Sequence, residues 1–322
     1  MATGSAAAPT QAKETFSAKD NVPAKSRSLT IVSFFSIYFI WGSTYLGIRY
    51  AVETIPPLYT AGFRHFIAGS ILLIWALAKG LRPTAQQIRA SVVIGVFFFL
   101  IGHGTLHWAE TRVPSGFASL IIASEPIWVF LMASLAEKSW RMNFSLGAGV
   151  VLGLAGVAIL LGHDAISSGS GMFLGAVAVL IGAIGWSVGI IYSRRSDLSG
   201  NPLLLSALSL LSGSLLLLAT GTAAGEARGF SFSQVTTRSW LALAYLIVFG
   251  SVIAFTAYNW LMEHYPPTFV ATHTYINPVV AVFLGWWLAG EKVTINVAIA
   301  AVLVIVAVFL VDRGMARLNV ER

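Results

Sequence analysis

The segment Trp41-Gly42-Ser43, followed by Pro57-Leu58, decides the fold because the chain repeats it. After 145 positions it returns as Trp186-Ser187-Val188, followed by Pro202-Leu203. Further along the chain the repeat continues at a spacing of 152 positions, which relates Trp108, Pro114 and Pro126 to Trp260, Pro266 and Pro278. Glu137-Lys138 likewise returns as Glu291-Lys292. The sequence therefore contains two related halves.

Each half carries five apolar stretches long enough to cross a bilayer, since about 20 apolar residues span the hydrocarbon layer as a helix. The stretches are continuous and rich in Gly and Ala, whereas the strands of a membrane β-barrel alternate between apolar and polar residues. The sequence predicts an all-α membrane protein with ten transmembrane helices, at about 30–52, 57–79, 88–109, 114–136, 143–161, 171–193, 202–222, 238–262, 267–289 and 294–312.

An odd number of crossings places the second half upside down relative to the first. Inverted repeats of this kind are common in secondary transporters. We expect the first five-helix repeat at 29–162 and the second, inverted repeat at 163–313. The polar residues 1–28 contain no apolar core of a signal peptide, so they are predicted to form a disordered cytoplasmic tail, with a second cytoplasmic tail at 314–322.

Composition and charge agree with a membrane protein. Hydrophobic residues make up 57% of the chain and charged residues only 10%, against about 25% in soluble domains. Of the 20 Lys and Arg residues, fourteen fall in the tails and loops on one side of the predicted bundle and five on the other, with Arg64 inside a helix. Positive charge accumulates on the cytoplasmic side. We therefore predict a multi-pass plasma (inner) membrane protein with both termini cytoplasmic, whose net charge of +7 does not indicate a nucleic-acid partner.

The ordered residues of the two halves resemble the EamA-type repeat of the drug/metabolite transporter superfamily. The residues that carry this resemblance are Trp41-Gly42-Ser43, Arg64, Ser124-Glu125-Pro126 and Glu137, then Trp186, Asn277-Pro278 and Gly290-Glu291. The resemblance covers 29–313. It implies a ten-helix carrier that exports amino acids or other metabolites, and the aromatic density is similar to exporters of aromatic amino acids of the YddG type. The second half departs from the first, with Asn277 in place of Glu125 and Ser209 in place of Arg64.

Two prolines are predicted to break helices near their middles. Proline lacks an N–H and frees the carbonyl four residues before it. Pro126 and Pro278 would free the carbonyls of Ile122 and Thr274. Breaks at corresponding points of two inverted halves point to a substrate site near the midplane, although a packed kink is the alternative.

Arg64 and Glu125 are charged residues inside predicted helices. Counting from Pro57 and Pro114 at 1.5 Å per residue places them about 10 Å and about 16 Å deep. Charges at such depths face a partner or a watery cavity, so we expect the two side chains to lie near each other or to share a cavity. A structural ion pair, a substrate contact and proton coupling through Glu125 all remain open.

His103 and His107 share one face of a helix, with Glu110 one turn further on. This spacing could hold a divalent metal. However, the chain has no cysteine and no second cluster of carboxylates. We therefore predict a polar cavity wall or a proton relay, and neither a metal nor another cofactor.

Several Trp and Tyr residues lie within helices, where their N–H and O–H groups need hydrogen-bond partners. Lining a central cavity would satisfy them and would favour flat aromatic or apolar substrates, whereas ordinary packing is the alternative. Together with the polar residues above, the predicted substrate-binding set is Trp41, Tyr45, Arg64, His103, His107, Trp108, Glu125, Trp128, Trp186, Tyr258, Trp260, His273, Tyr275 and Asn277.

These features predict a secondary transporter that exports a small metabolite, such as an amino acid, by alternating access. A channel-like or facilitative pore is the first alternative. An intramembrane enzyme is disfavoured, because the chain contains no HExxH or GxSxG motif. The predicted partners are the small-molecule substrate and the lipid bilayer. The sequence neither requires nor excludes an oligomer.

Overall fold

A computed structural model describes residues 24–138, 140–164, 166, 169–196, 201–265 and 267–320. Within these ranges the chain is helical and contains no strand. Nine helical passes in them are long and apolar enough to cross a membrane. The expected pass at 267–289 is divided into two helices, the longer of which has 17 residues. The predicted all-α membrane fold is confirmed.

The passes of the first half are assembled from shorter helices, several of them joined without an intervening loop. In chain order these are α1 (Ala24–Phe35), η1 (Ser36–Ile40), α2 (Trp41–Ala51), α3 (Pro57–Ala78), α4 (Ala85–Ile94), η2 (Gly95–His103), α5 (Gly104–Ala109), α6 (Ser115–Ile122), α7 (Glu125–Glu137), α8 (Phe144–Ile159) and η3 (Leu160–Asp164).

The second half is built in the same manner. Its described helices are α10 (Ser170–Arg195), α11 (Pro202–Ala223), η4 (Phe232–Gln234), α12 (Thr237–Tyr245), η5 (Leu246–Ile253), α13 (Ala254–His264), α14 (Pro267–Val270), α15 (His273–Ala289) and α16 (Ile295–Val320). Residues 1–23 of the expected first tail lie outside the described residues, whereas α1 already begins at Ala24 and α16 continues beyond the expected boundary at 313.

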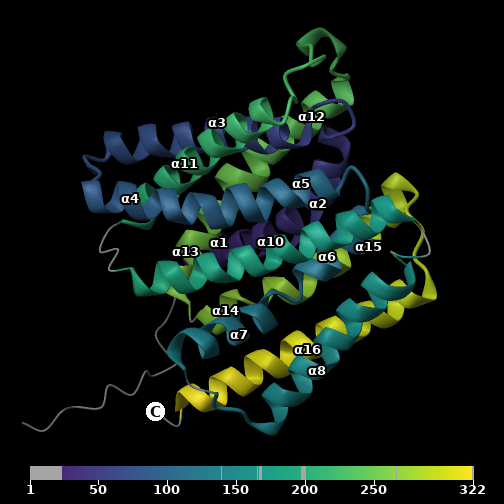
Figure 1. Ribbon diagram of the computed structural model, residues 1–322. Coiled ribbons are helices and arrows are strands. Elements are labelled where there is room, and N and C mark those ends of the chain that lie inside the picture. Colours follow the sequence, from purple (N-terminus) through teal and green to yellow (C-terminus); the bar gives the residue numbers. More distant parts are fainter. Residues whose placement is uncertain are drawn as a thin grey trace, which may run out of the picture.

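Equivalent passes of the two halves pack side by side. α3 lies along α11 on one side of the bundle, and α8 lies along α16 on the other, with α6, α10 and α15 between them (Figure 1). Glycine allows the close approach of α8 and α16, because a Cβ on Gly149 would lie 2.8 Å from the carbonyl oxygen of Ala307. Small residues at helix contacts are the usual basis of tight packing in membranes.

The two ends of the bundle differ in charge. The loops that follow α2, α5, α11 and α15 gather at one end, which we call the carboxylate end because it carries Glu53, Glu110, Glu226 and Glu291 (right side of Figure 1). At the opposite end, called the terminal end, the first turn of α8 meets the last part of α16 through a 2.9 Å hydrogen bond from Asn143 Nδ2 to the carbonyl of Gly314.

Three passes contain π-helical segments near their middles: η1 in the first pass, η2 in the third and η5 in the eighth. A π-turn closes hydrogen bonds from residue i to i+5 and is frequent at functional sites. It changes which backbone carbonyls remain available within the helix. The three segments therefore mark the middle of the bundle as the region in which to look for a site.

The fourth and ninth passes are both interrupted. The fourth breaks at Ala123–Ser124, directly before Glu125-Pro126, where the sequence predicts it. The ninth breaks at Ala271–Thr272, and α15 then runs without interruption through Pro278. The expected break at Pro278 is therefore wrong in position. One missing hydrogen bond is tolerated within a membrane helix that is packed against its neighbours.

Candidate functional site

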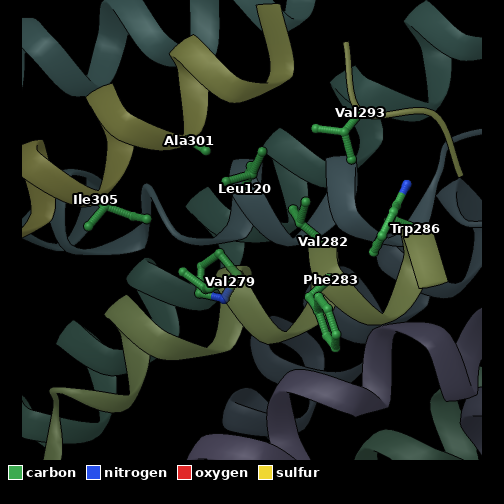
Figure 2. Close-up of a pocket in the computed structure, with 9 residues that line it drawn as sticks. Leu120, Val279, Val282, Phe283, Trp286, Val293, Ala301 and Ile305 are labelled. Carbon is green, nitrogen blue, oxygen red and sulfur yellow. The ribbon is translucent and has the colours of Figure 1, made fainter. Parts of the chain in front are cut away.

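An apolar groove lies on the surface between α6, α15 and α16 (Figure 2). Its lining is aliphatic and aromatic and includes Pro278, and Val279, Phe283 and Trp286 in it are each more than half exposed. In a bilayer such a surface contacts hydrocarbon. Pro278 is buried at the base of this groove, and the candidate polar site lies elsewhere.

Three half-buried rings from three different passes form an aromatic cluster, which consists of Trp41, Tyr258 and His273. The Trp41 ring lies 5.2 Å from Tyr258 and 5.1 Å from His273, centroid to centroid. The indole Nε1 of Trp41 donates to the carbonyl of Gly250 at 3.1 Å, within the π-helical η5. The aromatic cluster thus joins the first, eighth and ninth passes in the middle of the bundle.

Asn277 has a structural role at the edge of the aromatic cluster. Its side-chain nitrogen, turned toward the first pass, donates to the carbonyls of Tyr38 at 2.8 Å and Ile37 at 2.9 Å. These carbonyls belong to the π-helical η1. The Tyr38 hydroxyl is itself hydrogen-bonded to Thr272 at 2.7 Å. Asn277, predicted to bind substrate, therefore satisfies backbone groups of the π-turn.

Glu125 occupies the repeat-equivalent position, but its side chain does not make the contacts that Asn277 makes. It is half-buried at the start of α7, and its side chain accepts no hydrogen bond from any residue that the structure describes. Tyr45 and Tyr258 both lie within electrostatic range of it. The neighbouring Trp128 donates to Ser124 Oγ at 2.9 Å, so its indole N–H is already bonded at the helix break.

Arg64 is buried beside the aromatic cluster. Its Nε donates to Ser251 Oγ at 2.9 Å, and in the described part of the chain it forms no ion pair with a carboxylate. Of the alternatives left open for Arg64 and Glu125, the structural ion pair is therefore not formed in this conformation. A Cβ on Gly250 would lie 3.2 Å from Arg64 Nη2, so Arg64 and Trp41 contact the same short stretch of η5. An arginine without an anionic partner is a candidate site for the anionic group of a ligand.

Three histidines form a second group, the histidine cluster, of which His65 was not predicted. His65 Nε2 and His103 Nδ1 are 2.7 Å apart, and His107 Nδ1 donates to the carbonyl of His103 at 2.7 Å. The His103 ring stacks on Trp186 at 5.2 Å. His65 directly follows Arg64, and its position in a membrane helix is the signal that could have revealed it. Among the residues described, no group of three or more His, Cys, Asp or Glu side chains could hold a metal ion.

Glu110 directly follows the third transmembrane pass and is fully buried, and neither of its carboxyl oxygens has a hydrogen-bond partner among the described residues. Arg49 Nη1 donates instead to the backbone carbonyl of Glu110 at 2.6 Å. Burial raises the pKa of Glu110 well above its ordinary value, and the Glu291 carboxylate adds to the rise, whereas Arg49 and Arg64 oppose it. In the sequence, the spacing of Glu110 from His103 and His107 indicates only a possible metal ligand.

Three predicted site residues make their ring or hydroxyl contacts outside the aromatic cluster. Trp108 is at the carboxylate end, with the Arg112 guanidinium 3.7 Å from its ring. Trp260 stacks on His264 at 4.4 Å, near the terminal end of α13. The Tyr275 hydroxyl is hydrogen-bonded to Asp312 of α16. Each of these side chains has contacts that explain its position without a substrate.

Comparison with known proteins places this arrangement in a family. The model of the EamA-like transporter family matches residues 28–162 and again 173–312. The chain is 34% identical to the uncharacterized inner membrane transporter YedA of Escherichia coli (strain K12), over 87% of this chain and 89% of that protein. It is 27% identical to protein PagO of Salmonella typhimurium, over 87% of this chain and 91% of that protein.

A protein of known crystal structure shares the fold, with a TM-score of 0.60 at 21% identity, over 88% of this chain and 97% of that one. The duplicated family match covers both halves that the repeated tryptophans and prolines delimit. The relative YedA is named as an inner membrane transporter, in agreement with a bundle of apolar helices that has charged and aromatic side chains in its interior. The chain belongs to the EamA-like transporter family, within the drug/metabolite transporter superfamily.

Proposed function

We propose that the protein is an inner-membrane secondary transporter that carries amino acids, including aromatic ones, by alternating access. The observation that carries this proposal is the pair of charged groups around the aromatic cluster. Glu125 presents a carboxyl group with no partner among the described residues, and Arg64 presents a guanidinium group held by a single hydrogen bond. The rings of Trp41, Tyr258 and His273 contact one another. Glu125 lies within electrostatic range of Tyr258, and Arg64 lies near Gly250, to which Trp41 donates.

An amino acid is the simplest ligand that satisfies both charges. Its carboxylate would pair with Arg64, its ammonium group with Glu125, and its side chain would pack on the aromatic cluster. Unpaired charges are costly inside a membrane protein, so a zwitterion is favoured over a neutral solute. Aromatic rings favour flat or apolar side chains.

Export and location rest on the family. The relative YedA is named as an inner membrane transporter, and the excess of Lys and Arg in the loops of the terminal end supports a cytoplasmic position for that end. The packing supports access from the terminal end. At the carboxylate end α6 packs against α15, whereas α7, which continues the same pass toward the terminal end, has its main neighbours in α10 and α16.

Transport by the purified protein in proteoliposomes tests the proposal. We expect saturable flux of radiolabelled phenylalanine, methionine or threonine that unlabelled amino acid inhibits. Arg64→Gln and Glu125→Gln should each lower this flux at least tenfold. Arg238→Gln is the matched control, because Arg238 is exposed and pairs with Glu53 at the carboxylate end. Ohmic current in place of saturable flux would support a channel, and absence of any amino-acid flux would refute the proposal.

A further inference from the structure

Glu110 is a buried ionisable residue to which the proposed amino-acid site gives no role. We propose that Glu110 is a proton-binding site of the transport cycle, which holds a proton while the carboxylate end is closed and exchanges it with the medium at that end when the end opens. This inference rests on the proposed function, because it assumes that the protein is a transporter. It assigns a proton site and a source of energy coupling. In this proposal Glu110, and not Glu125, is the residue that couples transport to protons.

The first argument is the environment of the carboxyl group. Glu110 has no exposed surface, and neither oxygen accepts a hydrogen bond from a described residue. An ionised carboxylate without solvent or donors is strongly disfavoured, whereas a neutral carboxylic acid is tolerated. The Arg49 guanidinium donates to the backbone carbonyl of Glu110 and not to its carboxyl group. The geometry therefore favours the protonated acid in this conformation.

The charged and titratable groups that face Glu110 come from each neighbouring element. α2 contributes Tyr45 and Arg49, α3 contributes Arg64, and the loop after α15 contributes Glu291. His107 lies one turn earlier on the helix of Glu110 itself, while α10 packs the apolar Ala176 and Val179 against this region. The two arginines favour the ionised acid. Burial and Glu291 favour the neutral acid.

The second argument is that Glu291, whose charge acts on Glu110, is held in place by a contact between the two halves. Glu291 accepts hydrogen bonds from the backbone amides of Ser115 and Gly116, the first residues of α6. Separation of α6 from this loop would remove the Glu291 carboxylate and admit water. Both changes lower the proton affinity of Glu110. Because the closed and open states then differ in proton affinity, proton binding and conformation are coupled.

The histidine cluster extends from Glu110 toward the middle of the bundle. His107 Nδ1 must carry the hydrogen, because its partner is the carbonyl oxygen of His103, so the neutral ring leaves Nε2 without a hydrogen, and this nitrogen has no partner among the described residues. A second hydrogen bond joins His103 and His65, and the His103 ring stacks on Trp186. No hydrogen bond joins Glu110 to His107 in this conformation, so the histidine cluster lies between Glu110 and the half-buried interior without a continuous hydrogen-bonded path among the described residues.

Infrared spectroscopy of the full-length protein in lipid nanodiscs at pH 7 tests the protonation directly. The carbonyl stretch of a protonated carboxylic acid is visible and shifts in D₂O. Glu110→Gln should remove one such band, Glu110→Asp should displace it, and Glu53→Gln should leave it unchanged, since Glu53 is exposed at the same end. Identical wild-type and Glu110→Gln spectra in this region would overturn the proposal. Glu110→Asp keeps the test valid if Glu110→Gln does not fold.

A transport experiment tests the coupling separately. In proteoliposomes with a pH gradient, phenylalanine accumulation by Glu110→Gln should fall at least tenfold below wild type, whereas phenylalanine exchange at equal pH on both sides should persist. Unchanged gradient-driven accumulation would overturn the proposal. If the wild-type protein carries no amino acid, the proposed function fails, and the infrared band still decides whether Glu110 holds a proton.

Discussion

The carboxylate of Glu291 accepts a 2.7 Å hydrogen bond from the backbone amide of Ser115 and a 3.1 Å bond from the next amide. Glu226 does the same for Leu58 and Tyr59 at the start of α3, at 3.1 and 3.0 Å. In both cases a carboxylate of the second half caps a helix N-terminus of the first half, where unpaired amides and the helix dipole favour negative charge. These two contacts tie the halves together at the carboxylate end.

Glu291→Gln should loosen the carboxylate end. The neutral amide loses the charge interaction with the α6 N-terminus and one of the two acceptors, at a cost of about 1–2 kcal/mol. Ser119, one turn into α6, is 1% exposed, and the chain has no natural cysteine. A Ser119→Cys variant should therefore react faster with a maleimide when Glu291→Gln is also present. Equal rates in the two backgrounds would contradict this role of Glu291.

Reactivity of the same Ser119→Cys variant should depend on pH. Because the pKa of Glu110 is raised in the closed state, that state binds the proton more tightly than the open state. The closed state is therefore favoured at low pH, and the preference is lost as pH rises toward the raised pKa. The labelling rate of Ser119→Cys is divided by that of an exposed cysteine, Ala227→Cys, at the same pH. This ratio should increase with pH. Glu110→Gln should abolish the increase.

Gly250→Ala should displace Arg64, because the added methyl group would collide with its side chain. A Cβ at this position would lie 2.8 Å from Thr44 Cγ2 and 3.2 Å from Arg64 Nη2. Overpacking of this kind costs about 1–3 kcal/mol, and relief by movement of Arg64 should lower amino-acid flux about tenfold. Gly162→Ala is the matched control in another π-helical segment, because nothing lies within 4 Å of its added methyl group. Equal flux in the two variants would contradict the placement of Arg64.

Asn277 and Glu125 occupy equivalent positions of the two halves and should respond differently to substitution. Asn277→Ala leaves the carbonyls of Ile37 and Tyr38 without their donor and should destabilise the protein by about 1–3 kcal/mol. Glu125→Gln breaks no hydrogen bond within the described part of the chain and should change stability little while lowering flux. Thermal unfolding in detergent, measured beside transport, would separate the two effects. Similar losses of stability in both variants would contradict the distinction.

The orientation in the membrane is open to direct measurement. Single cysteines placed at Ala227, at the carboxylate end, and at Arg82, in the loop between α3 and α4 at the terminal end, are both exposed. A membrane-impermeant maleimide should label Ala227→Cys in intact cells and Arg82→Cys only after lysis. The reverse pattern would place both termini outside and reject the predicted topology.

The sequence predicts the passes and the break before Glu125 because hydropathy and proline act locally. It does not reveal Glu226 as a cap for α3, because that contact joins residues 168 positions apart. The π-helical segments leave no sequence pattern either, since packing between passes selects them. Trp108 and Trp260 were predicted from the repeat alone, and inversion places them at opposite ends of the bundle.

The π-helical η1 also governs how this protein can diverge. A π-turn contains one residue more than the α-helical count, and one residue corresponds to about 100° of rotation around the axis. Loss of a single residue within Ser36–Ile40 would turn everything before it by that angle relative to Trp41. One codon gained or lost there can therefore exchange the side chains that face the interior, a far larger change in ligand preference than any point substitution in the same helix.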